Sequence, residues 1–140
     1  MSNRIRLKQD VITYFRNNEL NIENVEDFED EKFTVIRIPV SLPSVPNSSF
    51  VVIIDDSKVQ IYNFNVANNI QKNSSILEAL NDLNIEYVFP KFYINGEDNV
   101  VCQQTLVSEN LTVDTLVDLF QMLIEVNGKA FDEIMKAKYK

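Results

Sequence analysis

One stretch of the chain, residues 74–106, constrains the fold more than any other, because a helix pattern leads directly into a hairpin pattern. Ser75 and Glu78 have the spacing of a capping box, in which each side chain pairs with a backbone N–H that the first helical turn leaves free. The apolar residues that follow repeat on one wide helical face, which comprises Ile76, Leu77, Ala79, Leu80 and Leu83. The aromatic run over residues 87–94 is expected to form a strand, which a turn at residues 95–99 returns into an antiparallel partner. The stretch therefore predicts a helix followed by a β-hairpin.

The rest of the chain adds two helix patterns and three strand patterns. Apolar residues spaced by three and four predict a first helix over residues 3–17. Runs of β-branched and aromatic residues predict strands over residues 33–40, 50–54 and 59–66, the last two forming a hairpin. Pro39 indicates the end or the edge of its strand, because proline cannot donate to a ladder, and further prolines predict a loop over residues 41–47.

A last helix begins after Thr112, which is a good N-cap residue, with Leu111 and Leu116 placed as a hydrophobic staple. Gly128 could end this helix, because glycine often follows a helix C-terminus. The apolar stripe keeps its phase on both sides of Gly128, so we expect one helix of about 25 residues. The resulting order is α-β-β-β-α-β-β-α. It predicts an α+β fold with a mainly antiparallel five-stranded sheet flanked by helices, in a single domain over residues 1–140.

Two groups of carboxylates are the first places to look for a metal or a catalytic site. The acidic run at residues 24–31 lacks the alternating ligands and central glycine of an EF-hand loop, so we expect a solvated loop. Asp55 and Asp56 are adjacent, and adjacent residues of a strand point to opposite faces. Aspartate is favoured in turns, so we expect a turn there. The sequence thus predicts no catalytic, cofactor-binding or metal-binding residue and no cofactor.

The composition excludes several classes of function. The chain has two glycines, no histidine and one cysteine. It therefore has no glycine-rich phosphate loop, no histidine base or ligand, and no disulfide within the chain. A net charge of −8 disfavours nucleic acid. The longest apolar run is too short to span a bilayer, and no signal peptide is evident, so we expect a cytoplasmic protein.

Residues 77–84 of the capped helix, the segment 92–95 and the opening of the last helix at residues 111–116 together resemble the YbjN-type bacterial domain family. That family shares its fold with the class I chaperones of type III secretion, so the resemblance implies the same fold here. The chaperones are dimers that hold an extended segment of a client protein. The resemblance therefore implies a homodimer or a protein client, and it implies no catalytic chemistry.

The sheet strands are apolar on both faces, which bears on binding. Period-two alternation places Tyr62, Phe64 and Val66 on one face of their strand and Asn63 and Asn65 on the other. Either the helices cover both faces of the sheet, or a second subunit or a client covers one of them.

We therefore expect a non-enzymatic, chaperone-like or regulatory module that binds a protein through apolar sheet or helix surface, with Tyr62, Phe64 and Val66 as candidate contacts. A small enzyme using carboxylate, lysine or tyrosine groups and a structural subunit of a larger assembly remain as alternatives.

Overall fold

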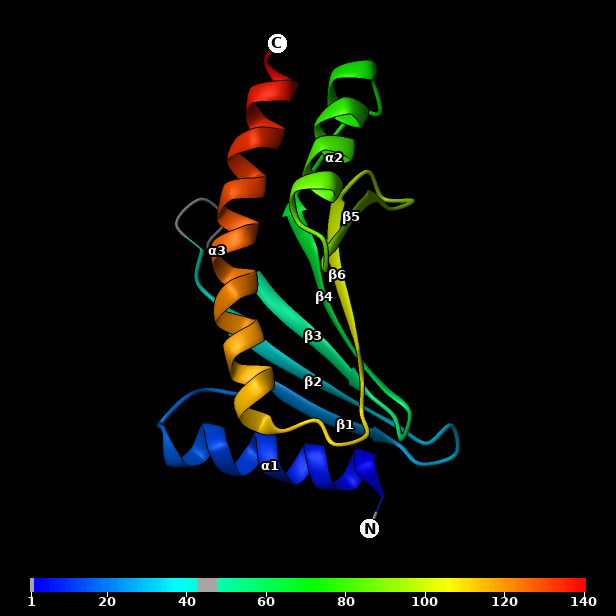
Figure 1. Cartoon of the computed structure of the whole chain (residues 1–140), viewed down its shortest axis with the longest axis vertical. Coiled ribbons are helices and arrows are strands. Elements are labelled where there is room, and N and C mark those ends of the chain that lie inside the picture. Colours follow the sequence, from blue (N-terminus) through cyan, green and yellow to red (C-terminus); the bar gives the residue numbers. More distant parts are fainter. Residues whose placement is uncertain (1, 43–47) are drawn as a thin grey trace.

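The computed structural model describes residues 2–42 and 48–140, which form three helices and six strands (Figure 1). In chain order the elements are α1 (Asn3–Asn17), β1 (Asn24–Phe28), β2 (Phe33–Val40), β3 (Ser48–Ile54), β4 (Lys58–Ala67), α2 (Ser74–Glu86), β5 (Lys91–Ile94), β6 (Val100–Val107) and α3 (Val113–Lys138). The predicted loop at residues 41–47 can be followed only at Ser41 and Leu42, since residues 43–47 lie outside the described part.

The described strands form one open antiparallel sheet in the order β1-β2-β3-β4-β6-β5. The α+β class and the antiparallel pairing were predicted, but the count of five strands was wrong, because the acidic run contains β1. This strand pairs with β2 only as far as Arg37. Pro39 therefore lies where one edge of β2 is free, as the sequence indicated.

The acidic run was predicted as a solvated loop because it lacks the spacing of an EF-hand loop and a run of like charge usually stays in water. In the structure Asp27 is partnered: Lys8 of α1 forms an ion pair with its carboxylate, and the Thr34 hydroxyl donates to it at 2.7 Å. Asp27 nevertheless remains exposed, so the run is solvated as predicted, but residues 24–28 form a strand and not a loop. These partners come from α1 and β2, so the acidic run by itself carried no sign of a strand.

All three helices pack against one face of the sheet. Even-numbered residues of β2 from Thr34 to Val40 are buried, and the residues between them are half-buried or exposed. The buried side joins a single hydrophobic core to which α1 contributes Leu7, α2 contributes Leu80 and α3 contributes Leu116. In Figure 1, α3 crosses the strands and α1 lies across the end of the sheet. None of the described helices covers the opposite face, so the helices do not cover both faces of the sheet, and its covering by a second subunit or a client stays a prediction.

The start of α2 differs from the predicted capping box. The N-cap is Asn73, whose side-chain oxygen accepts a hydrogen bond from the Ile76 N–H at 3.0 Å, and the helix begins at Ser74. Asparagine caps helices as well as serine does, so the cap falls two residues earlier than predicted. The apolar face of α2 is also narrower than predicted, because the Leu77 side chain is 53% exposed.

The expected strand at residues 87–94 is shorter than predicted. The Tyr87 N–H donates to the Leu83 carbonyl and ends α2, and β5 begins only at Lys91, after Pro90. Proline cannot donate to a ladder, which favours a strand that starts after it.

Helix α3 agrees with its prediction. Thr112 is the N-cap, and the helix runs for 26 residues without a break at Gly128.

Candidate functional site

The uncovered face of the sheet carries a band of apolar and aromatic side chains. We call it the open-face patch; its members are Val35, Val51, Ile53, Tyr62, Phe64 and Tyr93. The register sets Val51 beside Tyr62 and Ile53 beside Gln60, so β3 and β4 supply the centre of the patch. These strands are apolar on both faces because the residues between the patch positions fill the core. Val51 is only 5% exposed although no helix covers it, so the side chains of this face shield one another.

Tyr62 and Phe64 are the prominent aromatic pair of the patch. Their rings are stacked, with centroids 4.9 Å apart and planes 6° from parallel, and the Phe64 side chain is 38% exposed. The Gln60 amide donates to the Tyr62 hydroxyl at 3.2 Å. Burial raises the pKa of Tyr93, which lies on the same face. Hence the patch has an apolar, rigid centre with a few hydrogen-bonding groups among its rings.

Val66 does not belong to the open-face patch, although the alternation predicted that it shares a face with Tyr62. It is 1% exposed and lies in the core. The β4–β6 register shifts between Asn63 and Ala67, and such a bulge changes which face the following residues occupy. Asn65 N–H donates to the Asn63 side-chain oxygen at 3.0 Å within this irregular segment.

Asn63 was placed by the alternation on the face opposite Tyr62, and it is buried there at 3% exposed. Its amide nitrogen donates to the Asn127 side-chain oxygen of α3 at 3.0 Å, and the Asn127 amide donates to the Leu123 carbonyl at 2.6 Å. A buried amide is tolerated when its hydrogen bonds are satisfied. This polar contact between α3 and β4 stands at the residue where the bulge begins.

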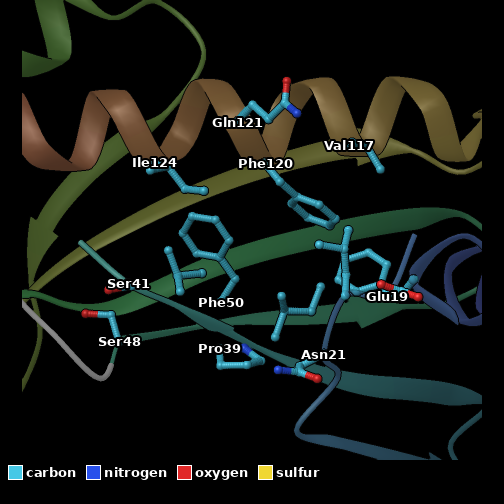
Figure 2. Close-up of a pocket in the computed structure, with 14 residues that line it drawn as sticks. Glu19, Asn21, Pro39, Ser41, Ser48, Phe50, Val117, Phe120, Gln121 and Ile124 are labelled. Carbon is cyan, nitrogen blue, oxygen red and sulfur yellow. The ribbon is translucent and has the colours of Figure 1, made fainter. Parts of the chain in front are cut away.

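A second feature is a cavity of about 600 Å³ on the helix-covered side, between α3, the C-terminal end of α1 and the ends of β2 and β3 (Figure 2). Phe120 and Ile124 point into it from α3, and Phe50 points toward them from β3 (Figure 2). Its apolar lining comes from Phe15, Leu20, Ile38, Pro39, Val40, Phe50, Val117, Phe120 and Ile124. The cavity lies beside Ile38, Pro39 and Val40, the part of β2 beyond Arg37 that β1 does not pair with. No sequence pattern predicted it, because it depends on where two strands end relative to each other.

The described residues form no cluster of three or more histidine, cysteine, aspartate or glutamate side chains able to hold a metal ion. The densest charged group surrounds Arg4, which is 7% exposed. Its guanidinium donates to the Thr34 hydroxyl at 3.1 Å and to Glu29 at 3.2 Å, and lies 3.7 Å from Asp27. Hydrogen bonds from Lys8 and Thr34 hold the pKa of the Asp27 carboxyl below its ordinary value. These charges compensate one another and join α1 to the edge of the sheet.

The other candidate chemical groups have structural roles. Asp55 forms the predicted turn, since its carboxylate accepts the N–H groups of Ser57 and Lys58 at 2.8 and 2.7 Å. The Asp56 carboxylate accepts the Arg4 N–H at the start of α1. Burial raises the pKa of the Cys102 thiol to about 12, which keeps it in the unreactive protonated form.

The fold and the open-face patch define an α+β domain with an open antiparallel sheet, in which the carboxylates and the thiol just described act structurally. A comparison with protein families matches residues 47–136 to YbjN, described as "Putative bacterial sensory transduction regulator". The match covers more than half of the chain, so the chain belongs to the YbjN family, as its resemblance implied. No curated protein and no solved structure matches the chain significantly. Within residues 2–42 and 48–140, no helix has the length and apolar character needed to cross a membrane.

Proposed function

We propose that this chain is a non-enzymatic regulatory module that binds another protein through the open-face patch, and that its first partner is a second copy of the chain. The observation that supports the proposal is the stacked Tyr62–Phe64 pair, at the centre of a sheet face that none of the described helices covers. Tyr62 is half-buried and Phe64 is exposed. Exposed apolar patches mark interaction sites, and tyrosine is enriched among the residues that dominate binding energy. The regulatory description of the family agrees with such a role.

A second copy suits this surface because the patch is centred on the middle of the sheet. β3 and β4 are the third and fourth strands of the six-strand order. A twofold axis parallel to β3 and β4, and placed between these two strands, would set Val51 of one copy over Tyr62 of the other. Symmetric dimers require such a self-complementary arrangement. The resemblance found in the sequence implies the fold of class I secretion chaperones, which are dimers with extended clients, and that implied fold favours the same arrangement. The proposal also includes a cytoplasmic location, since the lone Cys102 suits a reducing compartment.

The test is Phe64→Glu, with Leu77→Glu as a matched control. Both side chains are exposed and apolar, at 38% and 53%, but Leu77 lies on α2, away from the patch. We expect both variants to keep the circular dichroism spectrum of the native chain, since neither glutamate has to be buried. In sedimentation, the native chain and Leu77→Glu should form dimers and Phe64→Glu should stay monomeric, because a charge would enter the centre of the interface.

A native chain that stays monomeric at all accessible concentrations would end the proposal of a second copy. Affinity capture from the native host would then test a different protein partner, which should bind the native chain and Leu77→Glu but not Phe64→Glu. If Phe64→Glu keeps both its mass and its partners, the patch is ordinary exposed sheet.

A further inference from the structure

We infer that the cavity between α1, α3 and the ends of β2 and β3 is a binding site for a small, mainly apolar ligand that carries a cationic amine. This site is on the helix-covered side of the sheet and does not depend on the open-face patch. Its volume of about 600 Å³ falls within the range of about 300–1,000 Å³ found for small-molecule sites. The lining is mostly aliphatic and aromatic with a small number of polar groups, the usual chemistry of such sites.

The apolar part of the ligand would lie against the side chains that α3 and β3 contribute to the lining. Phe120 and Ile124 approach from one side and Phe50 from the other (Figure 2). The Phe50 and Phe120 rings are 6.1 Å apart between centroids, close enough to form one continuous aromatic wall. Because Ile124 is only half-buried, the lining is partly open to solvent. An alkyl chain that binds there removes apolar surface from water, which favours binding.

The charge of the ligand follows from the single ionisable residue of the lining, Glu19. Within the described part of the chain, the Glu19 carboxylate has no ion pair and no side-chain hydrogen bond. Among the described lining residues there is no lysine, arginine or histidine, so a fatty-acid carboxylate would meet a like charge and no counter-charge. A protonated amine at the same end would meet a carboxylate that has no other partner.

Glu19 is held at the cavity rim by the backbone. It follows α1 with φ at 54°, a left-handed conformation that glycine or asparagine usually adopts. Its N–H donates to the Arg16 carbonyl at 3.3 Å, and the Leu20 N–H donates to the Phe15 carbonyl at 2.8 Å. These two bonds form a Schellman motif, which fixes the direction of the chain after the helix. Glu19 and Leu20 are thereby both placed in the lining of the cavity.

The test compares three probes of equal chain length, decylamine, decanol and decanoate, each below its micelle concentration. Binding is followed by amide chemical shifts in two-dimensional NMR, which report both affinity and location. We expect decylamine to bind about three- to tenfold more tightly than decanoate. One partly solvated charge contact supports a ratio of this size when the attraction of Glu19 for the amine and its repulsion of the carboxylate are combined. The shifted amides should surround Phe50 and Phe120, not the open-face patch.

Two variants separate the charge from the cavity. Glu19→Gln should bring the affinities for decylamine and decanoate close to each other and leave decanol binding unchanged. Glu26→Gln, an exposed residue of β1 outside the cavity, removes the same net charge and should keep the preference for the amine. Ile124→Trp should fill the cavity and weaken all three probes, with circular dichroism to confirm its fold.

Three results would overturn the inference. The first is that no probe binds. The second is equal binding of decylamine and decanoate to the native chain, or a preference for decylamine that Glu19→Gln retains. The third is a set of shifts centred on the open-face patch. If Ile124→Trp does not fold, the ratio of decylamine affinity to decanoate affinity, compared between Glu19→Gln and Glu26→Gln, decides alone. Both substitutions are at exposed positions.

Discussion

Asn127→Leu provides a direct test of the buried contact that joins α3 to β4. The Asn127 and Asn63 side chains are 1% and 3% exposed and share a hydrogen bond of 3.0 Å. Leucine has a similar size, so the change creates little cavity and chiefly leaves the Asn63 amide buried without an acceptor. Such an unpaired group costs about 1–3 kcal/mol. The Leu123 carbonyl keeps the backbone bond that it makes within the helix.

We expect urea denaturation, followed by circular dichroism, to show this loss as a lower midpoint with an unchanged slope. Asn81→Leu is the control, since Asn81 is exposed on α2, and it should change the free energy of unfolding by about 0.5 kcal/mol or less. The double variant Asn63→Leu/Asn127→Leu should lose less than the sum of the single changes, by about 1–2 kcal/mol, because neither amide is then left alone. Additive losses, or a neutral Asn127→Leu, would refute the reasoning.

Two further predictions concern the helices and the sheet edge. Leu80→Ala removes a side chain that is 5% exposed and should cost about 2–5 kcal/mol in urea denaturation, whereas Asn81→Ala should cost little; equal costs would mean that the phase of α2 is wrong. Asp27→Asn should lower stability at neutral pH and lose its effect in acid. Because the folded-state pKa of Asp27 is lowered, its carboxylate stabilises the fold at pH values above its unfolded-state pKa. This stabilisation is lost as the pH falls through the folded-state pKa. Denaturation at several pH values measures this difference, and Glu26→Gln, which removes an exposed carboxylate from the same strand, is the charge control.

Local patterns predicted most of the elements because their signals lie within a few residues. The bounds of α1 and β2 match their predictions, and α3 has the predicted cap and continues through Gly128. A cap bonds to a residue three positions away, and a helical face repeats every turn, so neither requires knowledge of distant residues.

The missed strand β1 and the misplaced Val66 both depend on contacts between distant parts of the chain, whereas the shifted α2 cap and the late start of β5 have local causes. β1 is stabilised where Lys8 and Arg4 of α1 reach Asp27, so the acidic run could not be recognised as a strand from its own residues. The face of Val66 was wrong because Asn63, where the register shifts, is bonded to Asn127, 64 residues further along the chain. Strict alternation predicts faces correctly only while a strand keeps its register. Tyr62 and Phe64 precede the shift and share a face as predicted.

The two edges of the sheet bear on how this chain can associate. At β5, the Asn84 side chain of α2 accepts the Phe92 N–H at 2.7 Å and donates to the Phe92 carbonyl at 3.0 Å, so the outward backbone groups of Phe92 are already occupied. At β1 the edge is only five residues long and carries Glu26 and Asp27, and short, charged edges disfavour pairing with another chain. Association by strand addition would have to displace Asn84 or tolerate those carboxylates. Association through the open-face patch displaces nothing and covers apolar surface, so a face-to-face arrangement is the one that these edges favour.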